Sequence, residues 1–428
     1  MRVAFVCLGC KLNFSETSTW AREFVAGGHE RVGEKAEADL YVINTCSVTA
    51  HADKKCRQTI RQLKKRSPDA KIVVTGCYAQ LQPGEVLGIE GVDLVVGAEQ
   101  KPHLYVLVGR MMAPPTLPAD LKPVSAEMRS FGCQPEQIQS FFPAYSSGDR
   151  TRSFLKVQDG CDYRCSYCTV PLARGKSRNI SIQELVKQAQ ILADEGVKEV
   201  VLTGVNTGDF GRSTGESFLD LLKALAAVQG IARWRISSIE PNLLTEEILA
   251  WIAQTPSFMP HFHIPLQSGS DAILARMGRR YTSAVFAQRL AQIRHYLPQA
   301  FIGVDVIVGF PGEDTEAFAE TYTLLERLSP SFLHVFPYSK RPNTSAAGFP
   351  QQISELIKRE RVSRLNLLSD RLYTAFCIAN EGRSEEVLFE AVERGGMMSG
   401  FTRNYIKVWR PYEKSKIGAI ISVVLSKK

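Results

Sequence analysis

The chain has 428 residues, 44% of them hydrophobic and 22% charged, which is enough for about three globular domains. No stretch approaches the ~18 consecutive apolar residues of a membrane helix, and the apolar run after Met1 is too short for a secretory leader. We therefore expect a cytoplasmic protein with no membrane partner. The net charge of +8 favours a polyanionic partner, and ten cysteines in a reducing compartment favour metal binding over disulfides.

Residues 1–112 contain short apolar runs that alternate with helical patterns. Strands are predicted at residues 3–8, 40–44 and 72–75, and helices at 15–26 and 53–66. This alternation predicts βαβ units that build a parallel sheet. Residues 113–148 are rich in Pro, Ser, Gln and Gly, which predicts a linker with little core of its own.

Strands and helices alternate again over residues 149–375. Strands are predicted at 154–158, 199–203, 233–237, 261–265, 301–308 and 332–336, and helices include 182–195, 218–228 and 352–379. Repeated units of this kind predict an α/β fold with a full or partial β/α barrel. Residues 376–428 carry β-prone runs at 387–389, 405–409 and 420–425, which predict a small antiparallel barrel of the oligonucleotide-binding kind.

A CxxxCxxC loop follows the first predicted strand of the barrel. Its thiols belong to Cys161, Cys165 and Cys168. Cubane clusters usually take four cysteine ligands, so three thiolates would leave one iron open to another ligand. Zinc is the alternative, but a structural zinc site takes four protein ligands, and no Cys or His follows at a suitable spacing.

Cys10, Cys46 and Cys77 each come directly after a predicted strand of the N-terminal sheet. The carboxyl ends of parallel strands open on one edge, so these three thiols are expected to converge there. Gly9 and Gly76 would let the backbone approach a bulky cluster. The alternative is that the three are unrelated core cysteines.

The CxxxCxxC loop resembles that of the radical S-adenosylmethionine superfamily. There the open iron binds the amino and carboxylate groups of S-adenosylmethionine, and Tyr167 matches the aromatic position beside the adenine. With both cysteine triads in view, nearly the whole chain resembles the methylthiotransferase family. The matching segments include Gly9-Cys10-Lys11-Leu12-Asn13, Asn44-Thr45-Cys46, Thr75-Gly76-Cys77, Pro171 with Arg174-Gly175, and Asp305 to Glu313. The family's Arg-Ser pair after the cluster loop is Arg178-Asn179 here.

The resemblance implies three domains: a cluster domain at 1–112, a radical domain at 149–375, and an RNA-binding TRAM domain at 376–428, with 113–148 as a linker. It implies two [4Fe-4S] clusters, S-adenosylmethionine and a low-potential electron donor, and we expect a monomer. The cofactor contacts that it implies are Tyr167, Gly204, Asn206, Ser237, Glu240, Gln267 and Asp305.

Within this family, Gly-Cys-Lys-x-Asn resembles the branch that methylthiolates C2 of N6-threonylcarbamoyladenosine immediately 3′ of the anticodon in tRNA. The isopentenyladenosine branch usually has Gln after the cysteine, and the ribosomal-protein branch has Pro. The threonylcarbamoyl group ends in a carboxylate, so Lys11, Arg174 and Arg341 are predicted to bind it. Isopentenyladenosine, a ribosomal protein, or a regulator that binds RNA without turnover are the alternatives.

Two basic segments are candidate RNA surfaces. The first is the helix with Lys54, Lys55, Arg57, Arg61, Lys64, Lys65 and Arg66, and the second is the tail with Arg403, Tyr405, Lys407, Trp409 and Arg410. An ordinary solvated helix face is the alternative for the first.

Overall fold

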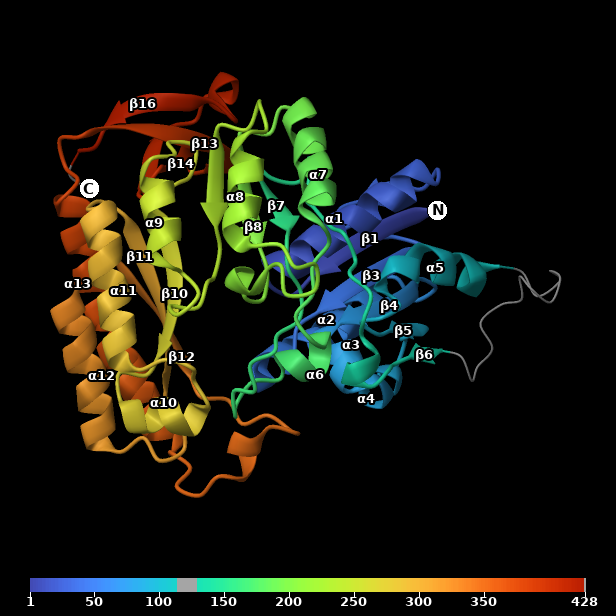
Figure 1. The fold of residues 1–428 in the computed structure, drawn as a ribbon. Coiled ribbons are helices and arrows are strands. Elements are labelled where there is room, and N and C mark those ends of the chain that lie inside the picture. The colour runs from blue at the N-terminus through green and yellow to red at the C-terminus, as the bar shows by residue number, and fades with distance from the viewer. Residues whose placement is uncertain (114–128, 427–428) are drawn as a thin grey trace.

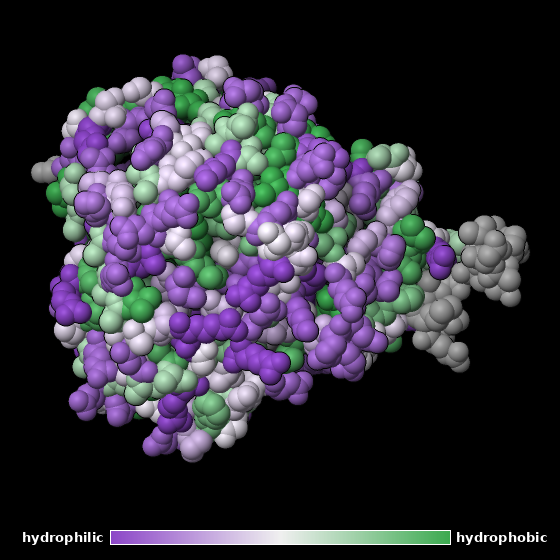
Figure 2. Space-filling view, in the orientation of Figure 1, coloured by the Kyte–Doolittle hydropathy of each residue, from purple (hydrophilic) through white to green (hydrophobic). Residues whose placement is uncertain are grey.

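The computed structural model describes residues 1–113 and 129–426. Figure 1 shows an N-terminal sheet, a barrel-like central region and a small C-terminal sheet, packed against one another. Among the described residues, no helix is both long enough and apolar enough to cross a membrane. Hydrophilic and apolar side chains are interspersed over the face shown in Figure 2.

The N-terminal sheet is parallel, as predicted. Its strands lie in the order β2 (Glu30–Val32), β1 (Arg2–Cys7), β3 (Leu40–Thr45), β4 (Lys71–Gly76), β5 (Leu94–Val96) and β6 (Ser130–Phe131). Separate apolar clusters cover its two faces, which explains why β3 is buried along its whole length. The helices are α1 (Lys11–Ala26), α2 (Ala50–Arg66), α3 (Cys77–Leu81), α4 (Pro83–Leu87) and α5 (Leu104–Met112).

The stretch predicted as a linker without a core differs from that prediction where the structure describes it. Strand β6 pairs with β5, and Phe142 and Ala144 are buried against the N-terminal core. The few apolar residues of this stretch are isolated among Pro, Gln and Ser, so its composition hides their burial. The Pro-rich residues 114–128 lie outside the described residues.

The central region is a partial β/α barrel. One parallel sheet contains β7 (Arg152–Lys156), β8 (Glu199–Thr203) and β9 (Arg233–Ile236), and the other contains β10 (His261–Gln267), β11 (Phe301–Val308) and β12 (Phe332–Pro337). Isolated bridges such as Ser238–His263 join the two sheets. The helices are α6 (Val170–Arg174), α7 (Ile182–Asp194), α8 (Phe218–Ala226), α9 (Glu246–Ala253), α10 (Asp271–Met277), α11 (Ser283–Tyr296), α12 (Thr315–Leu328) and α13 (Glu355–Ile378).

The C-terminal sheet is antiparallel, in the order β15 (Lys407–Pro411), β14 (Met397–Thr402), β13 (Ser384–Arg394) and β16 (Ile420–Val424). It is docked on the barrel, since Arg233 donates hydrogen bonds to the carbonyl oxygens of Phe401 and Glu386. Strand β14 was not predicted, because its sequence lacks a β-prone run. Tyr405, predicted to begin a strand, lies instead in the turn before β15 with a φ of 68°.

Candidate functional site

The CxxxCxxC loop leaves β7 and folds back on itself before α6. The Cys168 amide donates to the Cys165 carbonyl at 3.0 Å, and the Cys161 amide donates to the Gly175 carbonyl at 3.0 Å. Backbone amides also reach the sulfurs: Tyr163 N lies 3.4 Å from the Cys161 sulfur, and Val170 N lies 3.4 Å from that of Cys168. The loop therefore supplies hydrogen-bond donors to the sulfurs, as iron–sulfur sites commonly do.

A cavity of about 400 Å³ opens in front of these three thiols. Five of the predicted cofactor residues line it, namely Tyr167, Asn206, Glu240, Gln267 and Asp305. Gly204 and Ser237 are not among the lining residues, although their neighbours Val205 and Ser238 are. Most of the predicted contacts therefore share one cavity with the thiols.

Arg279 lies in the same cavity and was not predicted. Its guanidinium pairs with Glu240, donates to the Cys165 sulfur at 3.1 Å and to the Tyr167 hydroxyl at 3.3 Å. In the sequence it follows α10 and not a barrel strand, so a search for cofactor residues at strand ends does not find it. The basic pair after Gly278 is the signal that could have found it.

The second thiol triad lies at one edge of the N-terminal sheet. Cys10 directly precedes α1, Cys46 follows β3, and Cys77 begins α3 directly after β4. Since β1, β3 and β4 are adjacent, the three residues lie at neighbouring strand ends on this edge. Gly76 has a φ of 95°, and a Cβ there would lie 2.3 Å from the Thr45 carbonyl oxygen, so this turn requires glycine.

Asn13 explains the spacing of the Gly-Cys-Lys-x-Asn segment. Its side-chain oxygen accepts from the Cys10 sulfur at 3.3 Å, and its amide nitrogen donates to the Thr45 carbonyl at 2.8 Å. The same oxygen accepts from Arg174 at 2.7 Å. Asn13 thereby connects the loops that carry Cys10 and Cys46 and holds both against the barrel.

A buried ion network joins the N-terminal sheet to the barrel. Glu16 of α1 pairs with Lys101 at 2.7 Å, with Lys156 of β7 at 2.9 Å and with Arg174 at 3.3 Å. Asp159 pairs with Lys156 at 2.6 Å and with Arg174 at 2.9 Å. Burial alone would raise the pKa of both carboxyls, but these cations outweigh it and hold each pKa below its ordinary value.

Two of the predicted carboxylate-binding residues lie in such interfaces. Arg174 is part of the buried ion network, and Arg341 pairs with Asp53 at 2.5 Å and donates to Ser47 at 2.9 Å. Both side chains are almost completely buried. The structure therefore places them in contacts between the N-terminal region and the barrel, whereas Lys11 lines a cavity.

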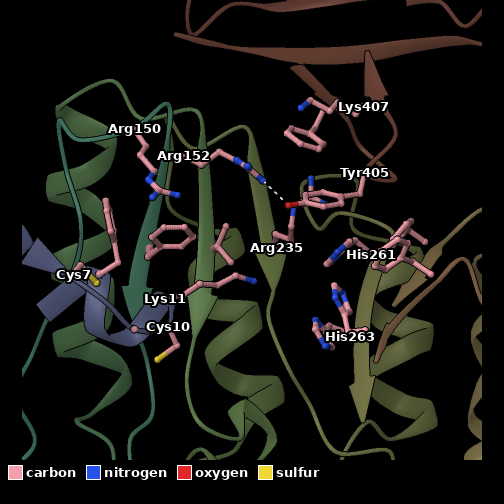
Figure 3. A pocket seen from close by; sticks show the side chains of 18 of the residues that line it. Cys7, Cys10, Lys11, Arg150, Arg152, Arg235, His261, His263, Tyr405 and Lys407 are labelled. Carbon is pink, nitrogen blue, oxygen red and sulfur yellow. Dashed lines mark hydrogen bonds between the residues drawn. The ribbon is translucent and has the colours of Figure 1, made fainter. Parts of the chain in front are cut away.

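The cavity that Lys11 lines has a volume of about 650 Å³ and lies between the N-terminal region, the barrel lumen and the C-terminal sheet. Figure 3 shows Cys10 and Lys11 on one side, His261 and His263 on another, and Tyr405 and Lys407 above. His263 Nε2 lies 2.6 Å from Asp305, which lines the cavity with the CxxxCxxC thiols. One hydrogen bond thus connects the two cavities.

Three cysteine thiols at each site are the donor type that iron–sulfur clusters take. No three Cys, His, Asp or Glu side chains among residues 1–113 and 129–426 converge on a single-ion site. A cubane places each thiolate on a different iron, so its ligands need not converge on one point. Burial raises the pKa of Cys46, Cys161 and Cys168 to about 12, so these groups are thiols until a metal takes the place of the proton.

Comparisons with known proteins agree with this geometry. Residues 2–97 match the uncharacterized protein family UPF0004, and residues 155–325 match the radical SAM superfamily. The threonylcarbamoyladenosine tRNA methylthiotransferase MtaB of Bacillus subtilis is 42% identical, over 99% of this chain and 94% of that protein. The protein of the same name from Aquifex aeolicus is 38% identical, over 99% of this chain and 100% of that protein. A tRNA-2-methylthio-N(6)-dimethylallyladenosine synthase of Acidothermus cellulolyticus is 33% identical, over 89% of this chain and 76% of that protein.

Among solved structures, the radical S-adenosylmethionine methyltransferase TsrM from Kitasatospora setae has the same fold. Its structure with cobalamin and a [4Fe-4S] cluster superposes with a TM-score of 0.57 over 93% of this chain and 80% of that one, at 15% identity. That likeness shows the fold, and the match to the radical SAM superfamily implies S-adenosylmethionine and a [4Fe-4S] cluster. The chain belongs to the radical S-adenosylmethionine tRNA methylthiotransferase family.

Proposed function

We propose that this enzyme transfers a methylthio group to C2 of N6-threonylcarbamoyladenosine in tRNA, immediately 3′ of the anticodon. The observation that carries the proposal is the cavity in which Cys10 lies beside Lys11. A free ammonium there can bind the carboxylate of the threonylcarbamoyl group, and an isopentenyl group has no charge for it to bind. The names of the relatives with 42% and 38% identity support the same substrate.

We propose further that Cys161, Cys165 and Cys168 hold one [4Fe-4S] cluster and that Cys10, Cys46 and Cys77 hold a second. When bound, the two clusters would supply the electron that cleaves S-adenosylmethionine and would hold the sulfur that is transferred. The protein provides binding, orientation and exclusion of water around them. Three thiols per site, each set at the edge of a parallel sheet, support this assignment.

The remaining residues of the thiol-lined cavity are proposed to bind S-adenosylmethionine. Asn206 is fixed by a hydrogen bond of 3.0 Å to Asp209, and Glu240 is fixed by its ion pair with Arg279. Such paired side chains hold one orientation without a ligand, which lowers the entropy that binding must overcome. Arg279 also holds Cys165 and Tyr167 by its other donors, so it positions both the loop and the cofactor residues.

Each region of the chain is proposed to have one role. We propose that residues 1–112 bind the second cluster, that 149–375 generate the radical, and that 376–428 bind tRNA with a contribution from α2. Lys54, Lys55, Arg61, Lys65 and Arg66 of α2 are exposed and could contact phosphates. Arg57 instead pairs with Glu85 at 2.9 Å. A low-potential protein is the proposed electron donor.

The substrate is tested by offering the reconstituted enzyme three anticodon stem-loop RNAs, with threonylcarbamoyladenosine, isopentenyladenosine or unmodified adenosine. We expect methylthiolation of the first to exceed that of the others by ~100-fold or more, because the wrong base would cover the Lys11 ammonium without giving it a carboxylate partner. The measurement is nucleoside mass spectrometry of the digested RNA. Preferential modification of isopentenyladenosine would assign the chain to the other tRNA branch, and a mass shift on a ribosomal protein alone would exclude tRNA.

A further inference from the structure

The turn before β15 places an aromatic side chain inside the barrel lumen. Tyr405 stacks on Phe401 with ring centroids 4.6 Å apart and contacts His261 at 4.6 Å. Its positive φ of 68° is unfavourable for a residue other than glycine, and this packing holds it. The C-terminal sheet therefore forms one wall of the cavity that contains Cys10 and Lys11.

Cations gather around the Tyr405 hydroxyl. Arg152 donates to it at 3.3 Å, and the guanidinium of Arg235 lies 4.8 Å from the centre of its ring. Figure 3 shows Arg152, Arg235 and Lys11 directed into the same space. Burial would raise the pKa of this phenol, but Arg152, Lys11 and Arg235 outweigh it and keep the pKa below its ordinary value. The field that stabilises a phenolate there would also stabilise a carboxylate.

Carboxylates only partly neutralise these cations. Glu199 pairs with Arg235 at 2.9 Å and Glu390 pairs with Arg152 at 2.9 Å. Lys11 has no ion pair or hydrogen bond with any carboxylate in the described parts of the chain, and no Asp or Glu lines the cavity there. Lys11, Arg150 and Lys407 therefore line the cavity without a carboxylate partner in the described parts of the chain, and their positive charges are left for an anionic ligand.

The shape and the walls of the cavity suit a nucleoside. Its volume of about 650 Å³ lies within the range of small-molecule sites. Phenylalanine side chains, on which a base can stack, supply much of the wall: Phe14, Phe154, Phe301, Phe332 and Phe401. A modified adenine in this cavity would have aromatic surface for its ring and the polar groups of Lys11 and Tyr405 within the same walls.

We propose that Lys11, Arg152 and the Tyr405 hydroxyl form a carboxylate-binding site that selects the threonylcarbamoyl group. The inference rests on the proposed function and assigns its specificity to residues from three regions of the chain. It gives the C-terminal sheet a role in recognising the modified base as well as in binding RNA. Lys11 supplies the charge, while Arg152 and Tyr405 supply donors whose positions are already fixed.

The test compares binding of the reconstituted enzyme to stem-loop RNAs that carry threonylcarbamoyladenosine or its carboxamide, in which a neutral amide of the same size replaces the terminal carboxylate. We expect the wild-type enzyme to bind the acid about ten- to a hundredfold more tightly, the range given by one hydrogen bond to a charged group. Lys11→Gln and Tyr405→Phe should lose most of this preference, and Lys11→Arg should keep part of it. Tyr405→Phe retains the stacked ring, so the turn should stay folded.

Two control variants remove the same kinds of group from positions that do not line the cavity. Lys416→Gln removes an ammonium that lies 3.9 Å from Glu413, and Tyr412→Phe removes a phenol hydroxyl just after β15. Both should keep the acid-to-carboxamide ratio, and all variants should still form 5′-deoxyadenosine. If Lys11→Gln and Tyr405→Phe keep the wild-type ratio, the carboxylate site is wrong while the tRNA substrate stands. If the wild-type enzyme itself modifies only isopentenyladenosine, the proposed function fails instead.

Discussion

Replacing Cys161, Cys165 and Cys168 together with alanine is expected to abolish the formation of 5′-deoxyadenosine from S-adenosylmethionine. The three thiols line the same cavity as Asn206 and Glu240, so losing them removes the only sulfur ligands beside the proposed cofactor site in the described chain. The loss should be complete, because no side chain can supply the electron. The measurement is chromatography with mass detection on anaerobic, reduced protein. Cys377→Ala, on α13, is the matched control and should leave cleavage unchanged.

The complementary variant lacks Cys10, Cys46 and Cys77. It should still form 5′-deoxyadenosine but yield no methylthiolated RNA, since these thiols lie at the edge of the other sheet. Iron should fall from about eight atoms per chain to about four, at four irons per cubane. Unchanged iron content would show that this triad holds no cluster. Equal loss of cleavage in both variants would contradict the separate roles of the two sites.

The largest effect on stability is expected from Glu16→Gln. The Glu16 side chain is completely buried among Lys101, Lys156 and Arg174, so neutralising it leaves Lys156 and Arg174 with Asp159, and Lys101 with no ion pair in the described chain. Removing one member of a buried ion pair costs about 3–5 kcal/mol. Thermal unfolding and denaturant titration measure this loss. Glu184→Gln, which breaks an exposed pair with Lys187, is the control and should change the stability by less than about 1 kcal/mol.

The same variant should change the dependence of stability on pH. The pKa of Glu16 is lower in the folded protein than in the unfolded chain, so its stabilisation is complete above the unfolded value of about 4.3. It is lost as the pH falls toward the folded value. Glu16→Gln should therefore lose less stability than the wild-type protein between about pH 5 and pH 3. Parallel curves for the two proteins would show that Glu16 is not ionised in the fold.

The longer strands of the three parallel sheets could be predicted, and those buried on both sides, such as β3 and β8, read as continuous apolar runs. The three-residue strands β2 and β5 were not predicted. One thiol triad followed, since Cys10, Cys46 and Cys77 each come after a predicted strand, and the CxxxCxxC motif identified the other. β6 and β14 could not be predicted in this way: β6 has only two residues, and β14 mixes Met, Ser, Gly and Thr. Their places depend on partner strands that local sequence does not identify.

Some of the site residues lie where the sequence predicted and others do not, because their positions depend on distant segments. Asn206, Glu240 and Asp305 follow or lie on barrel strands and line the same cavity as the CxxxCxxC thiols. Arg174 and Arg341 carry the charge expected of substrate-binding residues, but buried carboxylates on distant segments pair with them. Arg152 and Arg235 lie within strands that read as ordinary barrel strands, although their side chains line the lumen. Charge was visible in the sequence, and the partner of each charge was not.

The position of Tyr405 has a consequence for the order in which the site is assembled during synthesis. Chains emerge from the ribosome N-terminus first and their domains fold as units. Both thiol triads precede residue 169, whereas the turn that carries Tyr405 belongs to the last sheet of the chain. Until that sheet docks, the lumen on the side of Cys10 lacks one wall. Cys10 would therefore be accessible to iron from this side before the C-terminal sheet docks. The wall that is proposed to select the modified base would be added afterwards.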